Sequence, residues 1–153
     1  MAIALAIVLG IGGGLIFFLS RGKGPAAATP ITAKADPYAA SLPISDLQMS
    51  ESANLAGGKV TYIDGHIDNQ GTRVVTGITV QILFRNYAHE VAQNETQPLK
   101  LIRMRDPYID IEPVSAAPLK PGKTGDFRLI FDTVADSWDG AYPEIRILHV
   151  EFQ

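Results

Sequence analysis

The amino-acid sequence predicts an all-β domain, an antiparallel β-sandwich of about seven strands. From residue 44 onward, short apolar runs alternate with turn residues, which is typical of a sandwich and not of a helical domain. The run from 74 to 86 alternates almost throughout, which indicates a strand with one buried face. The inward set is Ile78, Val80, Ile82 and Phe84, and the outward set is Thr79, Gln81 and Arg85, with Leu83 its one apolar member.

Residues 60–86 are expected to form the centre of the domain as two long strands. The four residues 68–71 tolerate positive φ, so we expect a tight turn and a hairpin there. In the first of these strands Ile63, Gly65 and Ile67 share one face, and Asp64, His66 and Asp68 share the other. The full set of predicted strands is 44–55, 60–69, 74–86, 90–97, 109–114, 125–134 and 145–152.

The last two predicted strands carry local signals of their own. Residues 119–123 contain a Pro-Gly pair that is typical of a turn, and Phe127, Leu129 and Phe131 then point inward. In the final strand Ile145 and Ile147 are out of phase with the apolar residues from 148 onward. We expect a β-bulge to shift the register, the alternative being a strand covered on both faces.

Residues 1–20 contain no charged side chain and predict a single transmembrane helix. Such a helix is about 28 Å long, close to the thickness of a bilayer core. The alternative is a cleaved signal peptide with its processing site at 26–28. That alternative lacks a basic region before the apolar run, and Arg21 and Lys23 intervene before the alanines.

A stripe of small residues runs along one face of the predicted helix. Residues at a spacing of four share a helix face, and small side chains there let a second helix approach closely. The stripe predicts a membrane-protein partner; its alternative is the ordinary abundance of Ala and Gly in such helices. Its members are Ala2, Ala6, Gly10 and Gly14.

Residues 21–43 are predicted to be a linker between the helix and the domain at 44–153. The segment is rich in Ala, Pro and Gly and has no sustained apolar periodicity. Its final part places apolar side chains beside the first strand, where a sheet edge is expected to be open. We therefore expect residues 38–44, with Tyr38, Leu42 and Ile44, to be ordered against either the sandwich edge or a partner. The amides of residues 26–35 are expected to exchange freely in the isolated protein.

Charge and composition exclude several classes of function. The chain has 13 basic and 16 acidic residues. Two of the basic residues, Arg21 and Lys23, precede position 24, so the rest of the chain has 11 basic residues and all 16 acidic ones. This balance argues against a nucleic-acid partner. The chain has no cysteine, so disulfides and thiolate metal sites are excluded.

Catalytic motifs were sought among the histidines, acids and serines. His66, His89 and His149 lie far apart, and none has a second ligand-type residue at helical zinc spacing. Asp132, Asp136 and Asp139 lack the spacing of an EF-hand. No phosphate-binding glycine loop or nucleophile elbow is present. We expect no enzyme activity, no cofactor and no small-molecule substrate.

Four segments of the sequence carry a resemblance to a family. They are GKVTYIDGHIDNQG, VVTGITVQILFRN, APLKPGKTGDFRLIF and SWDGAYPEIRI, within residues 36–153. Together they resemble an uncharacterised family of bacterial single-pass membrane proteins with an immunoglobulin-like sandwich, related to FxLYD-type domains. The resemblance implies an immunoglobulin-like fold, a place in the bacterial envelope and no assigned catalysis.

The location of the domain relative to the membrane has two readings. The resemblance implies the inner membrane with a periplasmic domain. The positive-inside rule applied to Arg21 and Lys23 alone places the domain in the cytoplasm.

Three classes of function follow from these features. The first is a non-catalytic accessory, structural or assembly subunit of a larger membrane complex, with respiratory and photosynthetic complexes as candidate hosts. The second is an envelope ligand-binding or adhesive module that uses the loops at one end of the sandwich, where Tyr87, Trp138 and Tyr142 are expected to cluster. The third is an unrecognised hydrolase.

Overall fold

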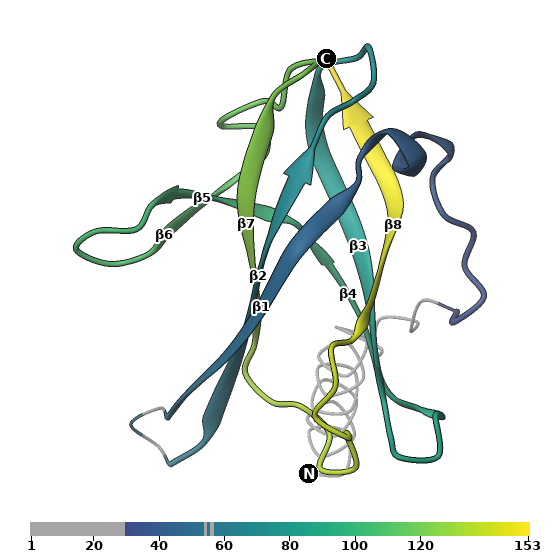
Figure 1. Cartoon of the computed structure of the whole chain (residues 1–153), viewed down its shortest axis with the longest axis vertical. Coiled ribbons are helices and arrows are strands. Elements are labelled where there is room, and N and C mark those ends of the chain that lie inside the picture. The colour runs from purple at the N-terminus through teal and green to yellow at the C-terminus, as the bar shows by residue number, and fades with distance from the viewer. Residues whose placement is uncertain (1–29, 54, 56) are drawn as a thin grey trace, which may run out of the picture.

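The fold is all-β and consists of two antiparallel sheets (Figure 1). The computed structural model describes residues 30–153 apart from 54 and 56. A short 3-10 helix, η1 (Pro37–Ser41), comes before the strands. The strands are β1 (Ile44–Ala53), β2 (Lys59–Asp68), β3 (Val75–Arg85), β4 (Val91–Pro98), β5 (Lys100–Met104), β6 (Asp110–Pro113), β7 (Thr124–Phe131) and β8 (Glu144–Phe152).

The strands divide into sheets of five and three. The five-stranded sheet has the order β1-β2-β7-β5-β6, and the three-stranded sheet has the order β4-β3-β8. The predicted β-sandwich of antiparallel strands is confirmed. All seven predicted strands are present, with ends shifted by a few residues, but β5 was not predicted because its apolar run is short and broken by Lys100 and Arg103.

The core between the sheets contains the side chains that the alternation in β3 predicted. Ile78, Val80, Ile82 and Phe84 are all buried. The ring of Phe84 packs edge-to-face on Phe131 of β7, with 4.9 Å between the ring centroids. The predicted bulge in β8 is also confirmed. The pairing with β3 passes from Ile147 to His149 without Leu148, so that Ile147 and Val150 are both buried.

Close packing at the core requires a glycine in β2. The ring of Phe127 lies directly over Gly65, so a Cβ atom at this position would collide with it and with Leu47. Opposite Gly65, β1 contains an extra residue in a bulge between Ser45 and Gln48.

The predicted hairpin between the second and third strands is wrong. β2 pairs with β1 and β7, whereas β3 pairs with β4 and β8, so the two strands belong to different sheets. Residues 69–74 therefore carry the chain across the sandwich. A turn that sends the chain to the other sheet has the same turn residues as a hairpin, so local sequence does not distinguish them.

The crossing is held by the buried side chain of Asn69. Its amide group donates hydrogen bonds to the carbonyls of Arg73 and Leu119, both at 2.8 Å. Its Oδ1 accepts from the backbone N–H of Gly71 and from the Tyr38 hydroxyl, both at 3.1 Å. All four hydrogen-bonding positions of the amide are thus used, which is what allows it to be buried.

The outer face of β3 differs from the prediction at Gln81. This side chain was expected to be exposed, but it is fully buried. Its Nε2 donates to the carbonyl of Pro30 and to Oδ1 of Asn94, both at 3.0 Å, and its Oε1 accepts from Arg146 at 3.3 Å. A segment far away in the sequence therefore packs near this side chain.

That segment is residues 30–36, which we call the strap. Arg146 of β8 donates to the carbonyls of Ile31 and Ala33, both at 2.7 Å. At the end of the strap the backbone N–H of Asp36 donates to the carbonyl of Ile147, and the Asp36 carboxylate accepts from the N–H of Val150. The strap thereby satisfies backbone groups on the edge strand β8.

The residues after the strap pack on the sandwich too. Asp36 caps η1 by accepting from the N–H of Tyr38 at 2.8 Å. The ring of Tyr38 packs edge-to-face on Phe152, and Leu42 is fully buried in the core. Leu42 was expected to contact the edge of the sandwich or a partner, but η1 turns its side chain between the sheets.

The predicted helix at 1–20, including Ala2, Ala6, Gly10 and Gly14, lies outside the described residues. Among the residues that the structure describes, no helix is long and apolar enough to cross a bilayer.

The core assignment predicts the effect of two matched truncations. Ile82→Ala removes a fully buried side chain and should lower the free energy of unfolding by about 2 to 5 kcal/mol, since it leaves a cavity. Ile130→Ala, the same change at a side chain exposed on the outer face of β7, should cost under about 1 kcal/mol. Urea unfolding of both variants measures this, and equal losses would contradict the assigned strand phase.

The strap predicts a pattern of amide hydrogen exchange. The N–H groups of Asp36 and Val150 should exchange slowly, because each is hydrogen-bonded across the strap and β8. Asp36→Ala should speed exchange at Val150, whereas Asp132→Ala, at an exposed carboxylate, should leave it unchanged. Fast exchange at Val150 in the unaltered protein would show that the strap does not hold β8.

Candidate interaction surfaces

Charged side chains form a continuous network on the outer face of the five-stranded sheet. The strand pairing sets Asp64 of β2 beside Arg128 of β7, and His66 beside Asp126. Arg128 binds Asp64 through two hydrogen bonds, of 2.6 and 2.8 Å. The guanidinium of Arg128 also lies over the ring of Tyr62, 4.8 Å from its centroid.

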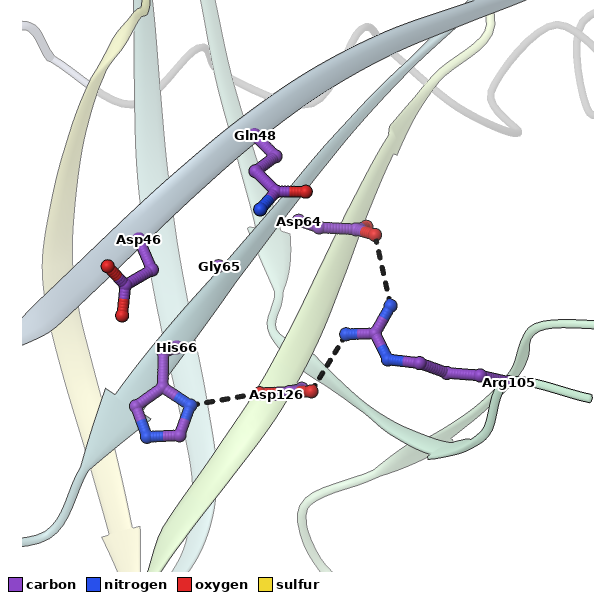
Figure 2. A pocket seen from close by; sticks show the side chains of 7 residues that line it. All are labelled: Asp46, Gln48, Asp64, Gly65, His66, Arg105 and Asp126. Atoms are coloured by element: carbon purple, nitrogen blue, oxygen red, sulfur yellow. Dashed lines mark hydrogen bonds and ion pairs between the residues drawn. The ribbon is translucent and has the colours of Figure 1, made fainter.

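Arg105 joins the two halves of this network. It lies between β5 and β6 and reaches the sheet from the side, as Figure 2 shows. Its guanidinium is 2.7 Å from Asp126 and 3.7 Å from Asp64. Arg105 thereby links the connection between β5 and β6 to the centre of the sheet.

His66 lies between two carboxylates. Its Nδ1 is 2.9 Å from Asp126, and its Nε2 is 3.2 Å from Asp68. The hydrogen bond with Asp126 is the main cause that raises the pKa of His66 above its ordinary value. Hydrogen bonds from Arg105 and then His66 lower the pKa of Asp126. The charged forms of both groups therefore stabilise each other.

A shallow pocket of about 180 Å³ lies over this network (Figure 2). Asp46 and Gln48 enter it from β1, where the bulge opposite Gly65 displaces the strand. Asp46 has a positive φ of 52°, which aspartate tolerates better than most residues. The pocket is lined by Asp46, Gln48, Asp64, Gly65, His66, Arg105 and Asp126.

The geometry limits what this pocket can do chemically. A histidine that acts as a general base needs one ring nitrogen directed at a nucleophile. Both nitrogens of His66 face carboxylates, and the nearby Ser45 hydroxyl points toward Asp46 at 3.4 Å. Within the described part of the chain, no group of three or more His, Cys, Asp or Glu side chains is placed to hold a metal ion. The arrangement is that of an ion-pair network that joins β2, β7 and Arg105.

Tyr38, Leu42 and Ile44 were expected to contact either the sandwich edge or a partner, and the structure shows contacts with their own domain. Leu42 is buried, and Tyr38 and Ile44 are partly buried against the core. Gly71 is required beside Tyr38, because a Cβ atom at this position would collide with the Tyr38 hydroxyl. These residues join the N-terminal segment to the sandwich.

Tyr87, Trp138 and Tyr142 lie at the same end of the sandwich. Tyr87 belongs to the loop 86–90 between β3 and β4, and the other two belong to the loop 132–143 between β7 and β8. The N–H of Asp139 donates to the carbonyl of Arg85 and so holds the two loops together. Tyr87 and Tyr142 are exposed, whereas Trp138 is half-buried, with its ring 5.4 Å from that of Phe84.

The ion-pair network was missed by sequence reasoning. Its one visible signal was the set of Asp64, His66 and Asp68 on a single strand face. Their partners Asp126 and Arg128 lie about 60 residues further on, and only the register of β2 against β7 brings them together. No local pattern could assign that register.

The raised pKa of His66 predicts a pH-dependent coupling with Asp126. A group whose pKa is higher in the folded state stabilises the fold below its unfolded pKa of about 6.5 and loses that contribution as the pH rises through its folded pKa. The coupling free energy between His66→Gln and Asp126→Asn should therefore be larger at about pH 5.5 than at about pH 8.5. It should be modest, because both side chains are partly exposed.

Urea unfolding of the two single variants and the double variant at both pH values measures this coupling. Arg103→Gln with Asp110→Asn, an ion pair without histidine, serves as the control cycle and should show no such change over this range. Equal coupling of His66 and Asp126 at both pH values would contradict the assignment.

Comparison with known proteins gives a family and no further relative. No curated protein and no solved structure matches the chain. One family model matches residues 39–144, from η1 to the start of β8, which is more than half of the chain. This range covers most of both sheets, including the network and the two loops at the end of the sandwich. The chain therefore belongs to the DUF2393 family, whose members are proteins of unknown function.

Proposed function

We propose that the chain is a non-catalytic, membrane-anchored subunit that serves the structure or assembly of a larger membrane protein complex. The observation that carries the proposal is the strap. Residues 30–42, which comprise the strap, η1 and Leu42, are fastened to the sandwich by hydrogen bonds from Gln81 and Arg146, by the bond from the Asp36 N–H to the Ile147 carbonyl and by burial of Leu42. If residues 1–20 span a bilayer, only residues 21–29 separate that span from the strap.

This shortened connection restricts where the domain can lie. Nine residues reach at most about 30 Å when fully extended. A domain on so short a tether stays close to the bilayer surface, within reach of the membrane-proximal parts of a neighbouring protein. A long linker, as expected from the sequence, would instead let the domain search a wide volume.

The proposal includes the finer features implied by the sequence. The sandwich is immunoglobulin-like and related to FxLYD-type domains, as the family resemblance implies. The chain lies in the inner membrane of a bacterium, and its helix packs on a partner through the small-residue stripe. A periplasmic domain fits the family resemblance, and a cytoplasmic one fits Arg21 and Lys23. Respiratory and photosynthetic complexes are candidate hosts.

A second candidate is an envelope ligand-binding or adhesive module. It is favoured by the exposed side chains of Tyr87 and Tyr142 on adjoining loops. The hydrolase alternative gains no support from His66, because carboxylates occupy both of its nitrogens.

The small-residue stripe tests the proposal. Replacing Gly10 and Gly14 together with Leu should leave the chain in the membrane fraction after alkaline carbonate washing, because the segment stays apolar. The same change should remove the chain from any complex that survives mild detergent, since the helix face would become too bulky for close packing.

Gly12→Leu is the matched control for this test, because position 12 lies on the opposite helix face. Blue-native electrophoresis followed by mass spectrometry of the co-migrating chains measures the outcome. If the Gly10 and Gly14 variant migrates in the same complex as the unaltered chain, packing through the stripe is refuted. If the unaltered chain migrates only as a monomer, the subunit proposal itself is refuted.

A further inference from the structure

The two loops at one end of the sandwich form a groove of about 300 Å³, which we call the loop-end groove. Leu83 and Arg85 of β3 and His89 of the loop 86–90 supply one wall, and residues between 139 and 144 supply the other. The bond from the Asp139 N–H to the Arg85 carbonyl fixes the walls relative to each other at 3.0 Å. The groove is lined by Leu83, Arg85, His89, Asp139, Ala141, Tyr142, Pro143 and Glu144.

One exposed tyrosine lines this groove and a second lies on the loop of His89, another residue of the lining. The Tyr87 side chain is on the first loop and is 85% exposed; Tyr142 is on the second and is 56% exposed. Clustered exposed aromatics indicate an interaction site, and tyrosine is enriched in protein interfaces. Behind them Trp138 is held by its ring contact with Phe84 and by a hydrogen bond from Nε1 to the Ala141 carbonyl. The loop that carries Tyr142 is therefore attached to the core.

The charges around the groove indicate its occupant. The loops 86–90 and 132–143 contain the carboxylates Glu90, Asp132, Asp136 and Asp139, and neither loop contains a lysine or arginine. The cation at the groove, Arg85, is already paired with Glu144 at 3.0 Å and bonded to the His89 carbonyl. Among the described residues, the three aspartates of the second loop make no ion pair. Of these aspartates Asp139 lines the groove, and Asp132 and Asp136 lie beside it on the same loop. The groove and the loops around it are therefore complementary to a basic segment.

The loop end of the sandwich lies near the point where the described chain begins. The described chain begins at Pro30, whose carbonyl is bonded to Gln81. Gln81 is two residues along β3 from Leu83, which lines the groove, a separation of about 7 Å. From there the strap runs away from the loops toward η1, at the other end of the sandwich in Figure 1.

We propose that the loop-end groove binds an extended, lysine- or arginine-containing segment of a partner protein, just outside the bilayer. This proposal rests on the proposed function, because the membrane tether is what turns the loops toward the partner's membrane-proximal residues. The cations of the segment lie against the aspartates, and its aliphatic or aromatic side chains pack on Tyr87 and Tyr142. An anionic lipid surface fits this end poorly, because four carboxylates would face its phosphates.

The test uses the full chain in nanodiscs of zwitterionic phosphatidylcholine. The probe is a fluorescent peptide of about 12 residues that alternates Lys or Arg with Leu or Tyr, and its counterpart carries Glu in place of each cation. We expect the basic peptide alone to bind in fluorescence anisotropy. Its affinity should fall about tenfold or more between about 50 and 500 mM salt, since the contacts are largely exposed ion pairs.

Two pairs of substitutions place the binding site. Tyr87→Ser with Tyr142→Ser and, separately, Asp136→Asn with Asp139→Asn should each weaken binding by about tenfold. The asparagine at 139 keeps the acceptor for the Ala141 N–H, so the loop should stay intact. Tyr108→Ser, at an exposed tyrosine between β5 and β6, is the matched control and should change nothing. Equal binding of both peptides, or equal weakening by Tyr108→Ser, would overturn the proposal.

Two other occupants of the groove give distinct results. Without peptide, the amides of loops 86–90 and 132–143 could become protected from hydrogen exchange only when the nanodiscs contain about 30% anionic phosphatidylglycerol. In that case the bilayer is the occupant and the proposal fails. If the chain dimerises in analytical ultracentrifugation with these loops protected, a second copy is the occupant and the proposal again fails.

The result also separates this inference from the proposed function. Loss of complex formation in the Gly10 and Gly14 variant, together with no effect of either loop variant on peptide binding or complex formation, would refute the loop-end groove alone. A chain that forms no complex in the membrane, yet binds the basic peptide at these loops, would refute the subunit role and leave the groove as a binding site.

Discussion

The fold depends on one buried amide, that of Asn69. A polar side chain is tolerated inside a β-sandwich only when its hydrogen bonds are satisfied, and here four partners satisfy them. Those partners come from η1, from the crossing between the sheets and from the segment before β7, so this one residue joins three parts of the chain. Its backbone adds two bonds, to the residues at 122 and 123 of the Pro-Gly turn. Asn69 therefore holds the crossing, η1 and the entry to β7 together.

This dependence explains which parts of the fold the sequence could predict. Alternation within β3 and β7 reflects burial along a single strand, so the inward set from Ile78 to Phe84 was identified correctly. The pairing of strands depends on contacts between distant residues, and for this reason the turn at 68–71 was assigned to a hairpin that does not exist. Gln81 shows the same limit: its burial comes from Pro30 and Arg146, respectively 51 and 65 residues away.

The same distinction applies to the candidate sites. Loop aromatics can be assigned to one end of a sandwich by counting strands, and Tyr87, Trp138 and Tyr142 do lie together there. The ion-pair network could not be found in this way, because Arg105, Asp126 and His66 come from three separate elements. From their apolar character Tyr38 and Leu42 were expected to contact either the sandwich edge or a partner, and the contacts that the structure shows are within the domain. Their apolar character therefore indicated burial without indicating the partner.

The contrast between paired and unpaired charges separates structure from recognition in this domain. On the outer face of β2 and β7 the carboxylates of Asp64, Asp68 and Asp126 each have an arginine or histidine partner. Little of their charge is therefore left to attract a ligand. Such a network mainly fixes the register and holds Arg105 in place, and its more exposed ion pairs, those of Arg105 and His66 with Asp126, contribute little net stability. At the loop end the aspartates lack such partners among the described residues, and tyrosines beside them remain open to solvent. The unpaired carboxylates of these loops are therefore available to a partner. The strap places them near Pro30, where the described chain enters the domain.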